Sequence, residues 1–126
     1  MHQIQVDTRR RVEIVDITHE VQRVVSGDGL AVVYTPHTTT AVIINEAESG
    51  LLRDIVETLA KLIPTAAGYE HDRTDNNADA HLRAIVLGNA VVVPVENGRL
   101  ALGTWQRILF VELDGPRKRR VYVKLL

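Results

Sequence analysis

The stretch LAVVYTPHTTTAVII, residues 30–44, decides the fold of this 126-residue chain. Both of its ends are apolar and rich in β-branched residues, which predicts buried strands over 30–35 and 41–44. The polar segment between them begins with Pro36 and His37 and continues with three threonines. A connection between two buried strands holds its side chains firmly and leaves them open to a ligand. We therefore expect a β-rich core and a candidate site at His37, where threonine hydroxyls suit an anion such as phosphate.

On either side of this stretch, hydrophobic periodicity predicts the other elements. Thr18 is expected to cap a short helix that runs through Val25. A longer helix is expected between Ser49 and Pro64, because apolar residues recur on one face, at Leu51, Ile55, Leu59 and Leu62. A third helix is predicted over 79–87. Strands are predicted over 4–6, 12–14, 90–95, 108–113 and 121–126.

Short turns join these strands, and Asn97-Gly98 is a strong hairpin signal. The last three strands follow one another closely, so we expect them to pair antiparallel. The sequence thus predicts an α+β fold: a β-rich compact single domain over residues 1–126, with mostly antiparallel strands and two or three helices.

Composition excludes several classes of protein. The chain is 45% hydrophobic and 25% charged with a net charge of -1, so it has no global attraction to nucleic acid or to anionic membranes. It has no cysteine and therefore no disulfide. The beginning of the chain is polar where a signal peptide would be apolar. We expect a cytoplasmic protein with no nucleic-acid partner and no membrane partner.

Three histidines, His37, His71 and His81, lie in three separate polar segments. If they converge, three protein ligands would leave one metal position open for water or substrate. The metal-free alternative is acid–base catalysis by one histidine on a bound phosphate. The structural alternative for the acidic loop is that Asn77 or Asp79 caps the following helix.

Other polar residues extend this set of candidates. Glu46 directly follows a predicted strand and would orient His37 or act as a base. Asp54 lies early in the long helix, where a carboxylate also has a purely structural reason to occur. Trp105 offers a stacking surface for a planar ring, or else an anchor in the core or at a subunit contact.

Four cations in a row, residues 117–120, have three interpretations. Such a run is found in nucleic-acid patches, but side chains alternate across a strand, so at most two point one way. A solvated strand start is the commonest case. A phosphate clamp that uses Arg117 and Arg119 is the more specific one.

In this order, these residues resemble the YjbQ-like family, also called the secondary thiamine-phosphate synthase family. The markers are HTT at 37–39, Asn45-Glu46, YEHD at 69–72, His81, Leu87-Gly88, NGR at 97–99, GTWQ at 103–106 and the basic last strand. The resemblance implies a homotrimer whose sites lie near subunit contacts and use the matching histidines, with a divalent metal, Zn or Mg, as the cofactor that such a set would hold.

The family name implies a transferase that joins a pyrimidine pyrophosphate to a thiazole phosphate and expels pyrophosphate. A phosphorylated small molecule is then the expected partner. The expected catalytic residues are His37, Glu46 and Asp54, and the expected metal ligands are His37, His71 and His81. The expected substrate-binding residues are Thr38, Thr39, Asn45, Trp105, Gln106, Arg117 and Arg119. Two alternatives stay open: a metal-assisted hydrolase with the same ligands, and a non-catalytic trimeric module that binds a phosphometabolite.

Overall fold

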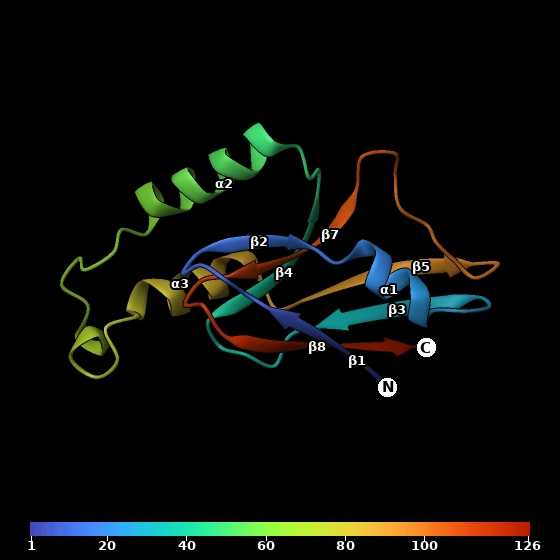
Figure 1. Ribbon diagram of the computed structural model, residues 1–126, viewed down its shortest axis with the longest axis horizontal. Helices are drawn as coiled ribbons and strands as arrows, with labels where there is room; N and C mark the ends of the chain where they lie inside the picture. The colour runs from blue at the N-terminus through green and yellow to red at the C-terminus, as the bar shows by residue number, and fades with distance from the viewer.

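Two antiparallel sheets and three helices make up the chain, which a computed structural model describes over residues 1–126 (Figure 1). The five-stranded sheet has the order β1 (His2–Asp7), β8 (Lys118–Leu125), β3 (Gly29–Tyr34), β5 (Ala90–Glu96) and β6 (Arg99–Leu100). The three-stranded sheet has the order β2 (Glu13–Asp16), β7 (Arg107–Glu112) and β4 (Thr40–Asn45). The helices are α1 (Thr18–Val24), α2 (Ser49–Leu62) and α3 (Ala78–Leu87), with a 3₁₀ turn η1 (Glu70–Arg73) before α3. The predicted α+β class is confirmed.

The three-stranded sheet is the middle layer of the molecule. Along β4, Val42 joins the larger hydrophobic core, which is formed with the five-stranded sheet and α1. Its neighbour Ala41 points the other way, into a second core that contains Leu59 of α2 and Ala84 of α3. Because side chains alternate along a strand, a strand with a layer on each face must be apolar at nearly every position, as β7 is.

The prediction that the last three strands pair with one another is wrong, although every strand pair is antiparallel. β5 pairs with β3 and β6, β7 pairs with β2 and β4, and β8 pairs with β1 and β3. The turn over 113–117 carries the chain from one sheet to the other, which lets β7 be covered on both faces. The hairpin at Asn97-Gly98 is confirmed: Glu96 pairs with Arg99, and both turn residues have positive φ, as a type I′ turn requires.

Two predicted helix caps are corrected. Thr18 is the first residue of α1, and its backbone N–H and hydroxyl both donate to Asp16. At α3, Asn77 occupies the N-cap position, but its side chain makes no capping hydrogen bond, and Asp79 lies within the helix. The backbone N–H of Ala78 instead donates to the carboxylate of Asp72 at 2.9 Å. The loop therefore folds back on the helix that follows it. The sequence next to the helix start does not indicate this contact, because Asp72 lies six residues before Ala78.

The carboxylate of Asp79 anchors α3 from the inside. It is fully buried, receives two hydrogen bonds of 3.0 Å from Arg11, and lies 3.3 Å from Arg83 Nη1. Burial by itself raises the pKa of Asp79, but hydrogen bonds and charge from Arg11, together with the charge of Arg83, outweigh it and leave the pKa below its ordinary value. This network fixes the start of α3 and thereby the position of His81.

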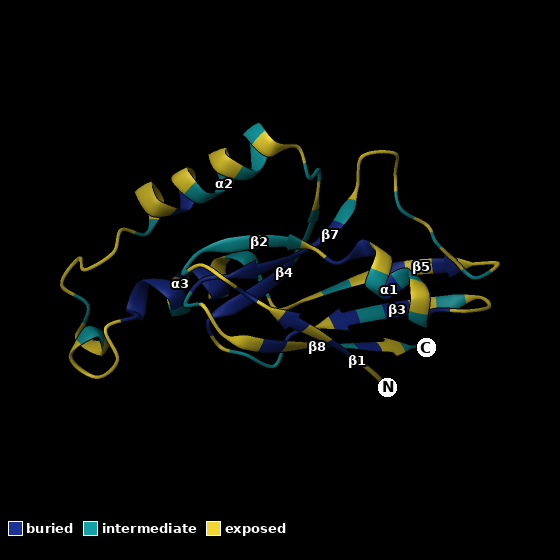
Figure 2. Ribbon diagram, viewed as in Figure 1, coloured by how far each residue is buried: buried dark blue, intermediate teal, exposed yellow.

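Large apolar side chains are exposed in two places on the molecule. Figure 2 marks along the ribbon which residues are exposed. On the outer face of the five-stranded sheet these are Leu30, Tyr34 and Val92, and on α3 they are Ile85 and Val86. None of the helices combines the length and the apolar character that crossing a bilayer demands.

Candidate functional site

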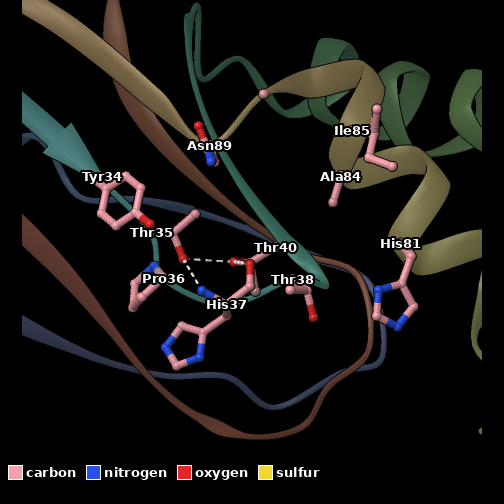
Figure 3. A pocket seen from close by; sticks show the side chains of 11 residues that line it. Tyr34, Thr35, Pro36, His37, Thr38, Thr40, His81, Ala84, Ile85 and Asn89 are labelled. Carbon is pink, nitrogen blue, oxygen red and sulfur yellow. Dashed lines mark hydrogen bonds between the residues drawn. The ribbon is translucent and has the colours of Figure 1, made fainter.

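A cavity of about 440 Å³ opens between the segment that precedes β4 and the helix α3 (Figure 3). His37 and Thr38 come from that segment, His81 comes from α3, and Asn89 comes from the link between α3 and β5. The remaining lining residues are Tyr34, Thr35, Pro36, Thr40, Ala84, Ile85 and Gly88. Two of the three predicted histidines, 44 positions apart in sequence (81 minus 37), thus share one cavity.

Threonine hydroxyls fix the shape of the His37 segment. Thr35 Oγ1 and Thr40 Oγ1 are hydrogen-bonded at 2.7 Å, and Thr40 Oγ1 also donates to the carbonyl of His37 at 3.1 Å. Thr39 is buried and accepts a hydrogen bond of 2.8 Å from Arg119 Nη2. Only Thr38 of the three consecutive threonines is exposed, so its hydroxyl is the one that a ligand could reach.

Arg119 belongs to the interior of the fold. Its guanidinium meets Glu112 through Nε–Oε1 at 2.8 Å and Nη2–Oε2 at 2.6 Å. Glu112 is fully buried and also accepts hydrogen bonds from the Thr8 hydroxyl and two backbone N–H groups. Burial raises the pKa of Glu112, but the hydrogen bonds from Arg119 and Thr8 outweigh that effect and hold the pKa below its ordinary value. The pair holds the His37 segment through Thr39 and does not line the cavity.

The ring of His37 is held by β8. Its Nε2 accepts a hydrogen bond of 3.0 Å from the backbone N–H of Arg120. Burial lowers the pKa of His37, and the nearby positive charges of Arg119 and Arg120 lower it further. The ring is therefore favoured in its neutral form.

His71 and His81 form a separate pair beside the cavity. Their ring centroids are 4.8 Å apart and the rings are nearly perpendicular, at 89°. Both rings line a second hollow of about 450 Å³ with Tyr69 and Glu70 of the polar loop. His71 Nε2 also lies 3.7 Å from Asp75. His81 is thus common to both hollows, whereas His37 and His71 share neither of them.

A single chain does not bring the three predicted metal ligands to one point. No group of three or more histidine or carboxylate side chains converges as a metal centre requires. His37 Nε2 is already engaged by Arg120, which leaves His71 and His81 as the two imidazoles that lie together. The three histidines of one chain are therefore not arranged to hold a single metal ion.

Asn45, Glu46, Trp105 and Gln106 assemble elsewhere. They line a hollow of about 310 Å³ between the end of β4 and the loop that precedes β7. Gln106 shapes that loop by accepting a hydrogen bond from the backbone N–H of Gly103, and Trp105 is 71% exposed. Glu46 was expected to orient His37 or act as a base beside it, but within one chain this hollow is distinct from the His37 cavity.

Asp54 and Arg117 lie apart from all three hollows. Asp54 is on an exposed face of α2. Arg117 donates to Asp114 at the turn before β8. Their predicted catalytic and substrate-binding roles find no neighbouring site residue within one chain.

Sequence reasoning missed Asn89 as a lining residue and Glu112 as the buried partner of Arg119. A signal for Glu112 was present, because a single carboxylate interrupts the apolar strand ILFVEL at 108–113 and needs a buried cation. The only feature of the sequence that could have indicated Asn89 as a lining residue is its position between a helix-ending glycine and an apolar strand.

Comparison with known proteins fits this fold and these motifs. The sequence profile described as "UPF0047 protein YjbQ-like" matches residues 2–126. A UPF0047 protein of Archaeoglobus fulgidus is 68% identical over 120 residues, covering 94% of this chain and 95% of its own. The UPF0047 protein YugU of Bacillus subtilis is 38% identical over 131 residues, covering 98% and 96%.

Solved structures agree with these sequence relatives. A crystal structure of a protein from Aeropyrum pernix K1 superposes with a TM-score of 0.95 at 47% identity, covering 99% of this chain and 96% of that one. A protein of the same family from Clostridium acetobutylicum gives a TM-score of 0.95 at 40% identity over the full length of both chains. The chain therefore belongs to the YjbQ-like UPF0047 family.

Proposed function

We propose that this chain is an enzyme that acts on a phosphorylated small molecule in the His37 cavity. The observation that carries the proposal is the composition of the cavity wall. It presents two imidazoles, threonine hydroxyls and the Asn89 amide, and it contains no carboxylate. Neutral hydrogen-bond donors without a competing anion suit phosphate oxygens.

The charge around the cavity supports an anionic ligand. Arg119 and Arg120 lie close enough to His37 to lower its pKa, so the positive potential of these residues reaches the cavity. Arg120 itself is on the surface, where its guanidinium donates to the Tyr122 hydroxyl. A phosphate group in the cavity would be attracted by Arg120, while Glu112 offsets much of the charge of its partner Arg119, and the phosphate oxygens would accept hydrogen bonds from the wall.

The reaction that we propose is the thiamine-phosphate synthase type. The thiazole nitrogen forms a bond to the methylene carbon of the pyrimidine substrate, and the carbon–oxygen bond to pyrophosphate breaks. Hydrogen-bond donors placed at the departing pyrophosphate stabilise the charge that develops on it. His37 and Thr38 would supply these donors. The His81 ring makes no hydrogen bond within the chain and would donate a proton to the leaving group.

We further propose that the active form is a homotrimer. The exposed side chains of Leu30, Tyr34 and Val92 form an apolar surface on the outer sheet, and such surfaces mark contacts between proteins. The exposed Trp105 would serve either this contact or a planar heterocycle.

The experiment is a pyrophosphate-release assay with a pyrimidine pyrophosphate and a thiazole phosphate. We expect turnover by the unaltered protein and its loss in H37A and H81A. H19A is the matched control, because His19 is exposed on α1 and lines none of the hollows described. Equal turnover in all four proteins would remove the His37 cavity as the site. If the protein shows no turnover but is stabilised by phosphate, the cavity would still bind a phosphorylated ligand, and the proposed reaction would be excluded.

A further inference from the structure

The His37 side chain takes over the hydrogen bonding of β3 beyond the end of that strand. β3 pairs with β8 as far as Tyr34, which lies opposite Tyr122. Two residues earlier along β8, the backbone N–H of Arg120 meets His37 Nε2 at 3.0 Å instead of a strand carbonyl. The ring thus satisfies a backbone donor that the departing strand leaves behind.

This hydrogen bond fixes which nitrogen of His37 carries the proton. A ring nitrogen that accepts a hydrogen bond uses its lone pair, so the same nitrogen can neither carry a proton nor bind a metal ion. A neutral imidazole has one N–H group, which must then be on Nδ1. Nδ1 makes no hydrogen bond within the chain, and His37 lines the cavity.

We propose that His37 is a neutral hydrogen-bond donor that binds a phosphoryl oxygen through Nδ1–H, and that it is not a metal ligand. The identity of the acceptor rests on the proposed function, whereas the position of the proton does not. The lowered pKa of His37 agrees with a neutral ring. Proton transfer in the cavity then falls to His81.

The first experiment reads the proton position directly. In the full-length ¹⁵N-labelled chain without ligand, two-bond ¹H–¹⁵N correlation spectra distinguish the two neutral tautomers of each histidine. The His37 signals are those that disappear in H37N. We expect the Nδ1–H tautomer at neutral pH. A proton on Nε2, or a ring that exchanges between tautomers, overturns the proposal whether or not phosphate binds.

The second experiment separates the two nitrogens by substitution. In H37Q the amide oxygen reaches the place of Nε2 and accepts from Arg120, but no donor remains at the place of Nδ1. In H37N the amide nitrogen keeps a donor near Nδ1, and the acceptor for Arg120 is lost. We expect H37Q to keep its Tm and to bind inorganic pyrophosphate at least about tenfold more weakly. We expect H37N to melt at a lower temperature and to keep most of its affinity.

The opposite pattern, in which H37N loses pyrophosphate and H37Q keeps it, overturns the proposal. An equal loss of affinity in both variants also overturns it, because the ring would then act only in holding the segment. H19N is the control for a histidine outside the cavity. If pyrophosphate does not stabilise even the unaltered protein, the proposed function and the phosphoryl acceptor fail together, and the spectra alone decide between donor and metal ligand.

Discussion

Arg119 and Glu112 face each other inside the protein with Nη2 and Oε2 2.6 Å apart and with side-chain exposures of 7% and 0%. The pair joins β7 of one sheet to β8 of the other, and Arg119 also ties it to the His37 segment by donating to Thr39. A buried charge without its partner is costly, so the two side chains must be kept or replaced together.

Breaking this pair is expected to destabilise the protein strongly. R119M leaves the Glu112 carboxylate buried without its cation, and we expect a loss of about 3–5 kcal/mol in the free energy of unfolding. Urea denaturation measures it. The matched control is R107M, which removes the partly exposed pair with Asp16, and its loss should stay below about 1 kcal/mol. Similar losses of stability in R119M and R107M would contradict the conclusion that Arg119 and Glu112 form a buried, mutually dependent pair.

Stability is expected to fall in acid because of Asp79 and Glu112. Both groups have a pKa below the ordinary value in the folded protein. A depressed folded pKa contributes stability that is complete above the unfolded pKa of about 4 and is lost as the pH falls through the folded pKa. Urea denaturation at a series of pH values should therefore show a decline below about pH 5. D79N should flatten that decline, even though it lowers the stability at neutral pH. An unchanged acid slope in D79N would show that other groups cause the decline.

The outer face of the five-stranded sheet is expected to lie in the proposed trimer contact. V92R places a charge on this apolar surface, and burying an unpaired charge disfavours assembly. Analytical ultracentrifugation should show trimers for the unaltered protein and smaller species for V92R. H19R, a charge added on α1, should remain trimeric. A monomeric unaltered protein would remove the trimer, and a trimeric V92R would place the contact on another face.

If a divalent metal binds to one chain, we expect it at His71 and His81 and not at His37. Their rings are 4.8 Å apart and Asp75 lies beside His71, whereas His37 Nε2 is engaged by Arg120. In histidine spectra recorded while Zn²⁺ is added, the signals of His71 and His81 should shift and those of His37 should not. H71A should bind Zn²⁺ at least about tenfold more weakly, and H37N should bind it as the unaltered protein does. Shifts that begin at His37 would support the three-histidine centre instead.

Much of the fold follows from local patterns. The strands around 30–44, the long helix that ends before Pro64 and the Asn97-Gly98 hairpin all depend on neighbouring residues, and the structure confirms them. The assignment of strands to sheets could not be predicted in this way. Tight turns of similar sequence can join two strands of the same sheet or two strands of different sheets. Which connection forms is decided by how the layers of the whole molecule pack.

The candidate site was accessible to sequence reasoning only in part. His37 and Thr38 were identified because their segment lies between two buried strands, but nothing local indicates that His81 shares their cavity. Arg119 was expected to contact phosphate. Its place on the same face of β8 as the buried Val121 and Val123 already indicated that its side chain points inward.

β7 has hydrogen-bonded neighbours on both edges and a covered surface above and below, so its residues 108–112 are fully buried in the native state. Deuterium can then replace its amide hydrogens only when the entire molecule opens. The amide of Phe110, opposite Val15 on one side and Val42 on the other, should be among the last to exchange. Its exchange rate would give the global unfolding free energy from a single position.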